Sequence, residues 1–217
     1  MDDWFEIVRA YCADPPADQT RAAGWILDND YQIVRALRCL NDDLPLHFYE
    51  RLPAIAGPHD TRSPRVFAIA QAVIDHSDPQ ITLTGLTHFI AQYQQSAVLT
   101  NAELWAMPSM LRLASLERFF DAVSEMDPSL ALPVKMSAET LAAADDRPVD
   151  RISSAITDLI TVDTIKWQDF VDNVSCIEAE LSSDPARVYS TMTFETRNRY
   201  RSVVELLASR CDSTEPE

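Results

Sequence analysis

The first residues that could do chemistry are Asp28 and Asp30, which flank Asn29. Metal-dependent sugar transferases hold a metal ion with this D-x-D pattern, because carboxylate oxygens are good ligands for hard cations. The motif works from a loop after a strand, where both carboxylates converge. Here it lies inside a helical pattern, in which the two side chains diverge by about 200°. We therefore interpret this pair as part of a solvated helix face.

A second pair, His59-Asp60, matches the His-Asp dyad of helical metal phosphohydrolases. Those enzymes need further His and Asp ligands from neighbouring helices. Gly57 and Pro58 place this pair in a turn, where an Asp commonly accepts backbone N–H bonds. A metal phosphohydrolase is thus one of three hypotheses for function, and bound metal in the purified protein is its test.

Other cofactor chemistry finds no support in the composition. With three glycines among 217 residues, neither a dinucleotide-binding nor a P-loop motif can be written. Zinc sites need closely spaced ligands, and the cysteines and histidines are dispersed. They are Cys12, Cys39, Cys176 and Cys211, with His47, His59, His76 and His88. We expect no cofactor, no metal and reduced thiols.

The charge of the chain restricts its partners. The net charge is −16, so nucleic acid and anionic membrane surfaces would repel it. An acidic surface with two lysines is compatible with a high-salt cytoplasm and equally with ordinary solubility. No apolar run reaches the roughly 20 residues that cross a bilayer, and the N-terminus lacks a basic signal region. We expect a cytoplasmic protein without direct membrane insertion.

Apolar periodicity predicts an all-α fold, a multi-helix bundle of about eight to ten helices. We expect an N-terminal bundle over 1–126, a connector over 127–148, C-terminal helices packed on the bundle over 149–211, and a frayed tail over 212–217. Single helices are expected over 18–40 and from about 164 to 181, and a short one after Ser137. No stretch has the alternation of a strand.

The central helix, near 100–121, organises the rest. Thr100 and Glu103 form a capping box at its start. Apolar residues then cover most of its circumference, which is typical of a helix surrounded by other helices. Pro108 falls in its second to third turn and should kink the axis.

The last helix, capped by Thr193, is a basic island in an acidic chain. Arg197 and Arg201 share a face, and Glu195–Arg199 and Arg201–Glu205 have the i,i+4 spacing of helical ion pairs. Two interpretations stay open: an internally salt-bridged helix face, or a docking site.

Several blocks in order along residues 25–205 resemble one family. They are Trp25–Asn29, Leu44–Pro53, Pro64–Phe67, His76–Asp78, Tyr93–Gln94 with Leu99–Arg112, Lys166–Ser175 and Met192–Arg201. These blocks are similar to the N-terminal region of cyclic β-1,2-glucan synthases, large bacterial glycosyltransferases of the inner membrane. The connector of this chain is shorter than the connector of that family.

The resemblance implies that the chain takes part in glucan biosynthesis without being catalytic. The synthases polymerise glucose from UDP-glucose, but their sugar-nucleotide site, membrane helices and glycosidase-like carboxylates follow the region resembled here. No catalytic residue can therefore be carried over. The resemblance implies an accessory or regulatory region that binds the transferase or membrane portion of such a synthase, in the cytoplasm at the inner face of the inner membrane. A stand-alone helical adaptor with another partner is the alternative.

Residues shared with the family that a core does not require are the candidates for docking. They are Arg65, Glu103, Trp105, Arg112, Trp167, Arg197, Arg199 and Tyr200. Each also has a structural explanation: Glu103 caps a helix, the two tryptophans are candidates for the core, and the arginines could bridge helices internally.

Overall fold

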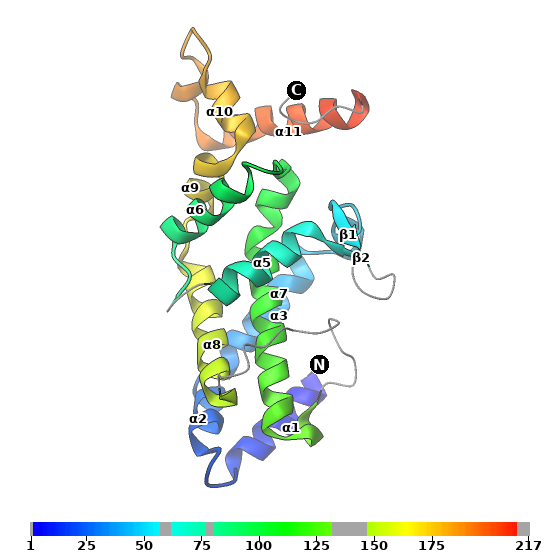
Figure 1. Ribbon diagram of the computed structural model, residues 1–217, viewed down its shortest axis with the longest axis vertical. Coiled ribbons are helices and arrows are strands. Elements are labelled where there is room, and N and C mark those ends of the chain that lie inside the picture. The colour runs from blue at the N-terminus through cyan, green and yellow to red at the C-terminus, as the bar shows by residue number, and fades with distance from the viewer. Residues whose placement is uncertain (1, 57–61, 77–79, 132–146, 212–217) are drawn as a thin grey trace. The chain divides into compact units, whose positions relative to one another are not determined.

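The computed structural model describes residues 2–56, 62–76, 80–131 and 147–211. These residues form eleven α-helices, two 3₁₀ turns and one short hairpin (Figure 1). The predicted all-α fold is confirmed. The chain divides into two compact units that interleave along the sequence. Unit 1 comprises Met1–Ile81 and Ser109–Thr164, and unit 2 comprises Thr82–Pro108 and Ile165–Glu217.

Unit 1 is built mainly from helices that pack around the C-terminal part of α7 (Asn101–Met126; Figure 1). Its elements are α1 (Asp2–Ala13), α2 (Thr20–Asp28), α3 (Asp30–Asp43), α4 (Leu46–Tyr49), β1 (Ala54–Ala56), β2 (Arg62–Pro64), α5 (Arg65–His76), Ser109–Met126 of α7, η2 (Pro128–Leu130) and α8 (Pro148–Thr164). Helix α2 packs against both α1 and α8, and α8 also contacts α3.

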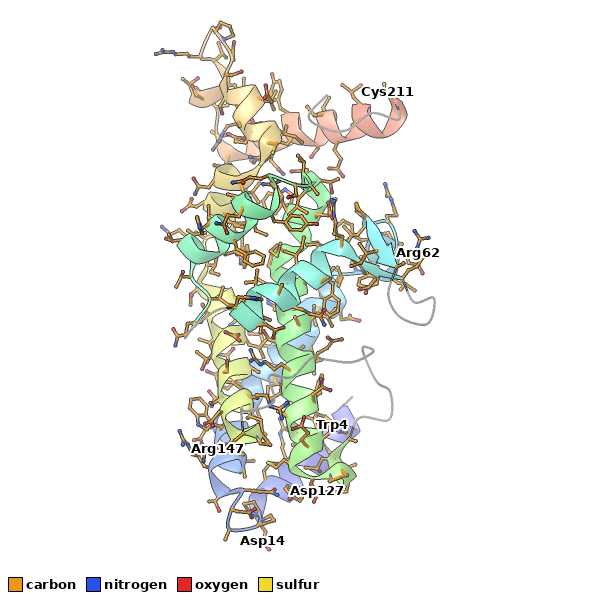
Figure 2. The ribbon with its side chains drawn as sticks, in the orientation of Figure 1. Trp4, Asp14, Arg62, Asp127, Arg147 and Cys211 are labelled. Atoms are coloured by element: carbon orange, nitrogen blue, oxygen red, sulfur yellow. The ribbon has the colours of Figure 1, made fainter. Side chains whose placement is uncertain are left out.

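The core of unit 1 gathers apolar side chains from α1, α2, α3, α7 and α8. Trp4 packs edge-on against Phe120, with ring centroids 5.0 Å apart, and its indole N–H donates to the carbonyl of Leu130 at 2.7 Å. Figure 2 shows Trp4 at the end of α7, near Asp127. The residues that begin the predicted connector are therefore tied to the first helix.

Unit 2 contains α6 (Leu83–Tyr93), residues 101–108 of α7, α9 (Trp167–Val174), α10 (Cys176–Ser182), η3 (Tyr189–Thr191) and α11 (Phe194–Cys211). Helix α6 packs against α9, while α10 contacts α9, η3 and α11. The amide of Gln94 fastens the end of α6 to α9 by donating to the carbonyl of Val174 at 2.8 Å.

Helix α7 has the predicted place and the predicted capping box. The backbone N–H of Thr100 donates to the Glu103 carboxylate at 2.9 Å, and the N–H of Glu103 donates to the Thr100 hydroxyl at 3.2 Å. Pro108 lies inside the helix, and the boundary between the two units directly follows it. The kink at Pro108 stays a prediction.

Two predicted helices are each divided in two. The expected helix over 18–40 breaks at Asn29, whose side-chain amide donates to the carbonyl of Trp25 at 3.0 Å. The helix expected from 164 to 181 breaks at Ser175, whose hydroxyl accepts from the N–H of Glu178 and begins α10. Short polar side chains bond to nearby backbone and so compete with helix continuation, which apolar periodicity does not detect.

A small hairpin was not expected from the sequence. Strands β1 and β2 pair antiparallel, with Ala54 opposite Pro64 and Ala56 opposite Arg62. Three residues are too few to show a period of two, so the pattern analysis missed them. His59-Asp60, the short helix after Ser137, most of the connector and the 212–217 tail lie outside the described residues.

The predicted division into 1–126, 127–148 and 149–211 stays a prediction, because compact units of contact need not fold independently. Helix α8, which belongs to the predicted C-terminal set, lies in unit 1. Among the described residues, no helix combines the length and apolar character that a bilayer crossing requires.

Candidate functional site

Among the described residues, the densest cluster of charged side chains lies in unit 2, where α9, α10 and α11 meet. Asp172 comes from α9, Glu178 from α10, and Arg197 and Arg201 from α11. We call these four residues the charged network. Each carboxylate accepts hydrogen bonds from both guanidinium groups, so the network closes on itself and carries equal positive and negative charge.

Most of the contacts are short. Arg197 donates through Nη2 to Asp172 Oδ2 at 2.7 Å and through Nη1 to Glu178 Oε1. Arg201 donates through Nη1 to Asp172 Oδ1 at 2.8 Å and to Glu178 Oε2 at 2.7 Å. The spacing of four residues on α11 places both arginines on one face, so that they reach the same two carboxylates.

The charged network is partly removed from water: the side chains of Arg197 and Asp172 are 19% and 25% exposed, and the other two are buried. The Arg201 side chain is 0% exposed and that of Glu178 is 6% exposed. The Phe194 ring lies beneath both arginines, with guanidinium carbons 4.9 Å (Arg201) and 5.9 Å (Arg197) from its centroid. Such cation–π contacts strengthen when they are desolvated. Phe194 in turn packs edge-on against Trp105, with ring centroids 6.0 Å apart.

Tyr189 completes the cluster from η3. Its hydroxyl donates to Glu178 Oε2 at 2.7 Å. Burial raises the pKa of Tyr189, and the hydrogen bond to the Glu178 carboxylate raises it further. The pKa of Arg197 is also raised, since its hydrogen bonds to Asp172 and Glu178 outweigh the cost of desolvation. Both shifts keep the protons on the donors, so the hydrogen bonds persist across the physiological pH range.

Some donors in this cluster have no acceptor. Nε of Arg197 and both Nε and Nη2 of Arg201 lack a hydrogen-bond partner among the described residues, as does the indole nitrogen of Trp105. Because all four oxygens of the two carboxylates are already occupied, the network offers no free base to a substrate. It is suited to fastening four elements together rather than to catalysis.

Unit 1 has a smaller ion-pair cluster around Arg112. Arg112 donates to Asp163 at 2.9 Å, and Arg35 approaches the other carboxylate oxygen of Asp163 at 3.2 Å. Asp43 lies 3.9 Å from Arg112. The cluster links α3, α7 and α8, so Arg112 acts as an internal bridge.

Two buried acids in unit 1 stand apart from these pairs. Burial raises the pKa of Glu117 to about 7, against the lowering effect of a hydrogen bond from Gln71 at 3.1 Å. Burial likewise raises the pKa of Asp158 to about 7, although the nearby Arg118 charge opposes the shift. Both side chains are almost fully enclosed, so neither is placed to meet a substrate.

The predicted site residues distribute over both units. Arg197 belongs to the charged network, Trp105 reaches it through Phe194, and Tyr200 packs edge-on against Tyr189 with ring centroids 6.0 Å apart. These three predicted residues are brought together. Arg199 lies outside the network and forms the predicted exposed pair with Glu195 at 3.2 Å.

The other predicted residues serve separate local structures. Glu103 is buried and caps α7, as its structural explanation proposed. Trp167 packs edge-on against Phe170, with ring centroids 5.5 Å apart. Arg65 is half-buried at the start of α5, where its N–H donates to the carbonyl of Pro53 at 2.7 Å.

The predicted Arg201–Glu205 pair is wrong. Arg201 turns toward Asp172 and Glu178, and Glu205 instead accepts from the side-chain amide of Asn101 at 3.1 Å. An exposed i,i+4 ion pair contributes only about 0.2–0.5 kcal/mol. The bonds of Arg201 to the Asp172 and Glu178 carboxylates are therefore favoured over a pair with Glu205. Sequence reasoning also missed Asp172, Glu178, Tyr189 and Phe194 as members of the site.

One signal could have found part of this set. The Met192–Arg201 and Lys166–Ser175 blocks of the resemblance contain Phe194, both network arginines and Asp172. An arginine pair at i,i+4 and acids on the two preceding helices would have suggested a buried network. Glu178 and Tyr189 lie outside the blocks, so only the fold reveals them.

No group of three or more His, Cys, Asp or Glu side chains within the described ranges has a geometry that could hold a metal ion. Asp30 of the D-x-D pattern pairs with Arg9 at 2.8 Å. The expected absence of metal and cofactor stays a prediction.

Comparison with known proteins connects the chain to one enzyme. It is similar to the cyclic β-(1,2)-glucan synthase NdvB of Rhizobium meliloti (strain 1021), with 26% identity over 284 residues. The chain is related to a region of a glucan synthase. The match includes 98% of this chain and 10% of NdvB, so the chain spans about one tenth of the length of its relative. No family model matches the chain.

The matched region is longer in NdvB than in this chain. The match extends over 284 residues, whereas the chain has 217. NdvB therefore carries additional residues within the matched region.

Proposed function

We propose that this chain is a non-catalytic helical region of a cyclic β-1,2-glucan synthase system, equivalent to the N-terminal region of such a synthase. The observation that carries the proposal is the similarity to NdvB, which includes 98% of the chain. A match that extends over both units fits a whole module better than a single shared motif.

The chemistry of the described side chains supports a non-catalytic role. The four residues of the charged network form ion pairs with one another. The acids with raised pKa values, Glu117 and Asp158, are enclosed within unit 1. A general base must reach the proton that it abstracts, and these groups are not accessible to a sugar nucleotide.

The partner in this proposal is the transferase or membrane portion of a synthase that uses UDP-glucose, and the module acts at the inner face of the inner membrane. The module would stabilise or regulate that portion. NdvB is a cyclic glucan synthase by its name, and about nine tenths of it lie outside the matched region. That remainder is large enough to contain a separate catalytic centre.

A segment exchange in NdvB tests the proposal. One variant lacks the matched segment (the deletion variant), and a second carries this chain in its place (the chimaera). Glucan synthesis from UDP-glucose is measured in membranes containing equal amounts of each protein. We expect the deletion variant to lose synthesis and the chimaera to recover a substantial part of it. Equal synthesis by the two would contradict the proposal.

The purified 217-residue chain provides the second arm. Incubated with UDP-glucose and Mg²⁺, it should release no UDP above the level of a protein-free blank. Turnover of UDP-glucose by the chain alone would show that the region is itself catalytic.

A further inference from the structure

Helix α11 turns a charged face inward and an apolar face to water, which is the reverse of an ordinary surface helix. A surface helix of a globular protein turns its apolar face to the core and its charged face to water. In α11 the inward face carries Arg197 and Arg201 of the charged network. The outward face carries Val203 and Leu207, which are 53% and 55% exposed.

The charged network fixes this orientation. Successive helical residues are rotated by about 100°, so Val203 lies about 200° from Arg201, on the far side of the helix. Arg201 is held by two carboxylates and is 0% exposed. Rotating the helix to bury Val203 would expose the charged network and break its ion pairs. The apolar residues of α11 therefore stay exposed to water.

The outward residues form a contiguous strip. Tyr200, Val203 and Leu207 follow one another at i, i+3 and i+7, and Tyr200 is 47% exposed although its ring also touches Tyr189. Leu206, 48% exposed, lies on the same helix, and the other large exposed apolar residues are spread over other segments of both units, where isolated examples need no explanation. Three on one strip of one helix are typical of a surface that another surface covers.

The strip has a basic edge. Arg199 and Arg210 are exposed and lie on the same side of α11 as Val203. Arg199 pairs with Glu195 in solvent, and Arg210 has no ion-pair partner among the described residues. In a chain of net charge −16, this edge favours carboxylates on the opposing surface.

We propose that the α11 strip, formed by Tyr200, Val203 and Leu207 with Arg199 and Arg210 at its edge, binds an apolar surface flanked by acidic residues on the remaining polypeptide of a glucan synthase. This inference rests on the proposed function. The matched segment is about one tenth of NdvB, so most of the polypeptide that could cover the strip lies outside it.

Two other occupants fit less well. A second copy of the chain in a two-fold arrangement would place the same arginines on both sides of the interface, where like charges repel. An anionic membrane would meet the negative charge of the whole chain at close range. A protein surface with a few acidic residues beside an apolar patch avoids the first penalty and limits the second, because its negative charge faces only Arg199 and Arg210.

The chimaera defined above tests the strip with a matched pair of variants. Val203→Glu puts a charge at the centre of the strip, and Ser202→Glu puts the same residue at the adjacent exposed position on another side of the helix. We expect Val203→Glu to reduce glucan synthesis to the level of the deletion variant, and Ser202→Glu to retain the synthesis of the unmodified chimaera. A charge reversal, Arg210→Glu, should also lower synthesis without removing an apolar contact.

The folding of each variant is checked on the purified chain by circular dichroism and by its urea midpoint, which should be unchanged. An unmodified chimaera no more active than the deletion variant overturns the proposed function. An active chimaera in which Val203→Glu and Arg210→Glu change nothing overturns the docking strip alone.

Two measurements on the purified chain separate the other occupants. The molar mass from light scattering should be that of a monomer, and a dimer that Val203→Glu dissociates would assign the strip to a second copy. Sedimentation with anionic lipid vesicles should leave the chain in the supernatant. Binding to the vesicles that Val203→Glu abolishes would assign the strip to a membrane and overturn the proposal.

Discussion

At the scale of single residues, the buried acids differ in how many hydrogen-bond donors each carboxylate has. Glu178 accepts from two arginines and a tyrosine, so its desolvation is compensated. Glu117 has one neutral hydrogen-bond donor, Gln71, and its pKa is raised to about 7 by burial. These two glutamates should respond differently to loss of charge.

Removing the charge of Glu178 should weaken the fold. In Glu178→Gln the two network arginines lose one of their two anionic partners, which we expect to cost about 3–5 kcal/mol of unfolding free energy. Glu195→Gln, the matched control, breaks the exposed pair with Arg199 and should change the unfolding free energy by less than about 0.5 kcal/mol. Urea unfolding of the full chain measures both, and equal effects would contradict a structural role for the network.

Removing the charge of Glu117 should have the opposite sign above neutral pH. A carboxyl group whose pKa is raised from 4.5 to about 7 on folding binds its proton more tightly in the folded state, so its contribution to stability is lost as pH rises through about 7. Glu117→Gln stays neutral and escapes this loss. We expect its stability relative to wild type to increase between pH 5 and pH 8, by about 1–3 kcal/mol.

The same comparison with Asp158→Asn should give a change of the same sign, since burial also raises the pKa of Asp158 to about 7. Urea midpoints at the two pH values are the measurement. A stability difference from wild type that does not depend on pH would show that these acids are not protonated on folding.

At the scale of elements, a side-chain cap marks where α7 begins. The Thr100 hydroxyl accepts from the N–H of Glu103 and thereby starts α7. Thr100→Ala should cost about 1–2 kcal/mol of unfolding free energy. Thr157→Ala is the control, because the Thr157 hydroxyl only bonds back to Ser153 inside α8, and its loss should be nearly neutral. Thermal unfolding of both variants would detect the difference, and equal shifts would contradict the cap.

The sequence predicts helices well where apolar periodicity is long, and poorly where one polar residue interrupts it. The period locates α5, α6 and α7, which are each three turns long or longer. It passes over Asn29 and Ser175, where a single side-chain hydrogen bond to the backbone ends or starts a helix. It also passes over β1 and β2, which are held by pairing with each other rather than by an internal pattern.

The candidate site was predictable only in part for a related reason. Arg197 and Arg201 share a face by their spacing, which the sequence gives directly. Their partners depend on how α9, α10 and α11 cross, and no spacing in the sequence encodes that crossing. Arg201 was therefore assigned to Glu205 on its own helix, whereas tertiary packing brings it Asp172 and Glu178.

At the scale of the whole molecule, the chain contains two interleaved units, and α7 contributes residues to both. Its similarity to NdvB extends through both, at 26% identity. The network and the caps help each unit to hold its shape, and the α11 strip leaves large apolar side chains exposed. We propose that the function of this module is to bind the rest of a glucan synthase.

Glucan synthesis by the NdvB chimaera relative to the deletion variant is the measurement that tests this most directly. We expect membranes with the chimaera to make more cyclic glucan from UDP-glucose than membranes with equal amounts of the deletion variant, while the purified chain alone makes none. Equal synthesis by the chimaera and the deletion variant, or glucan made by the isolated chain, would contradict a non-catalytic accessory role.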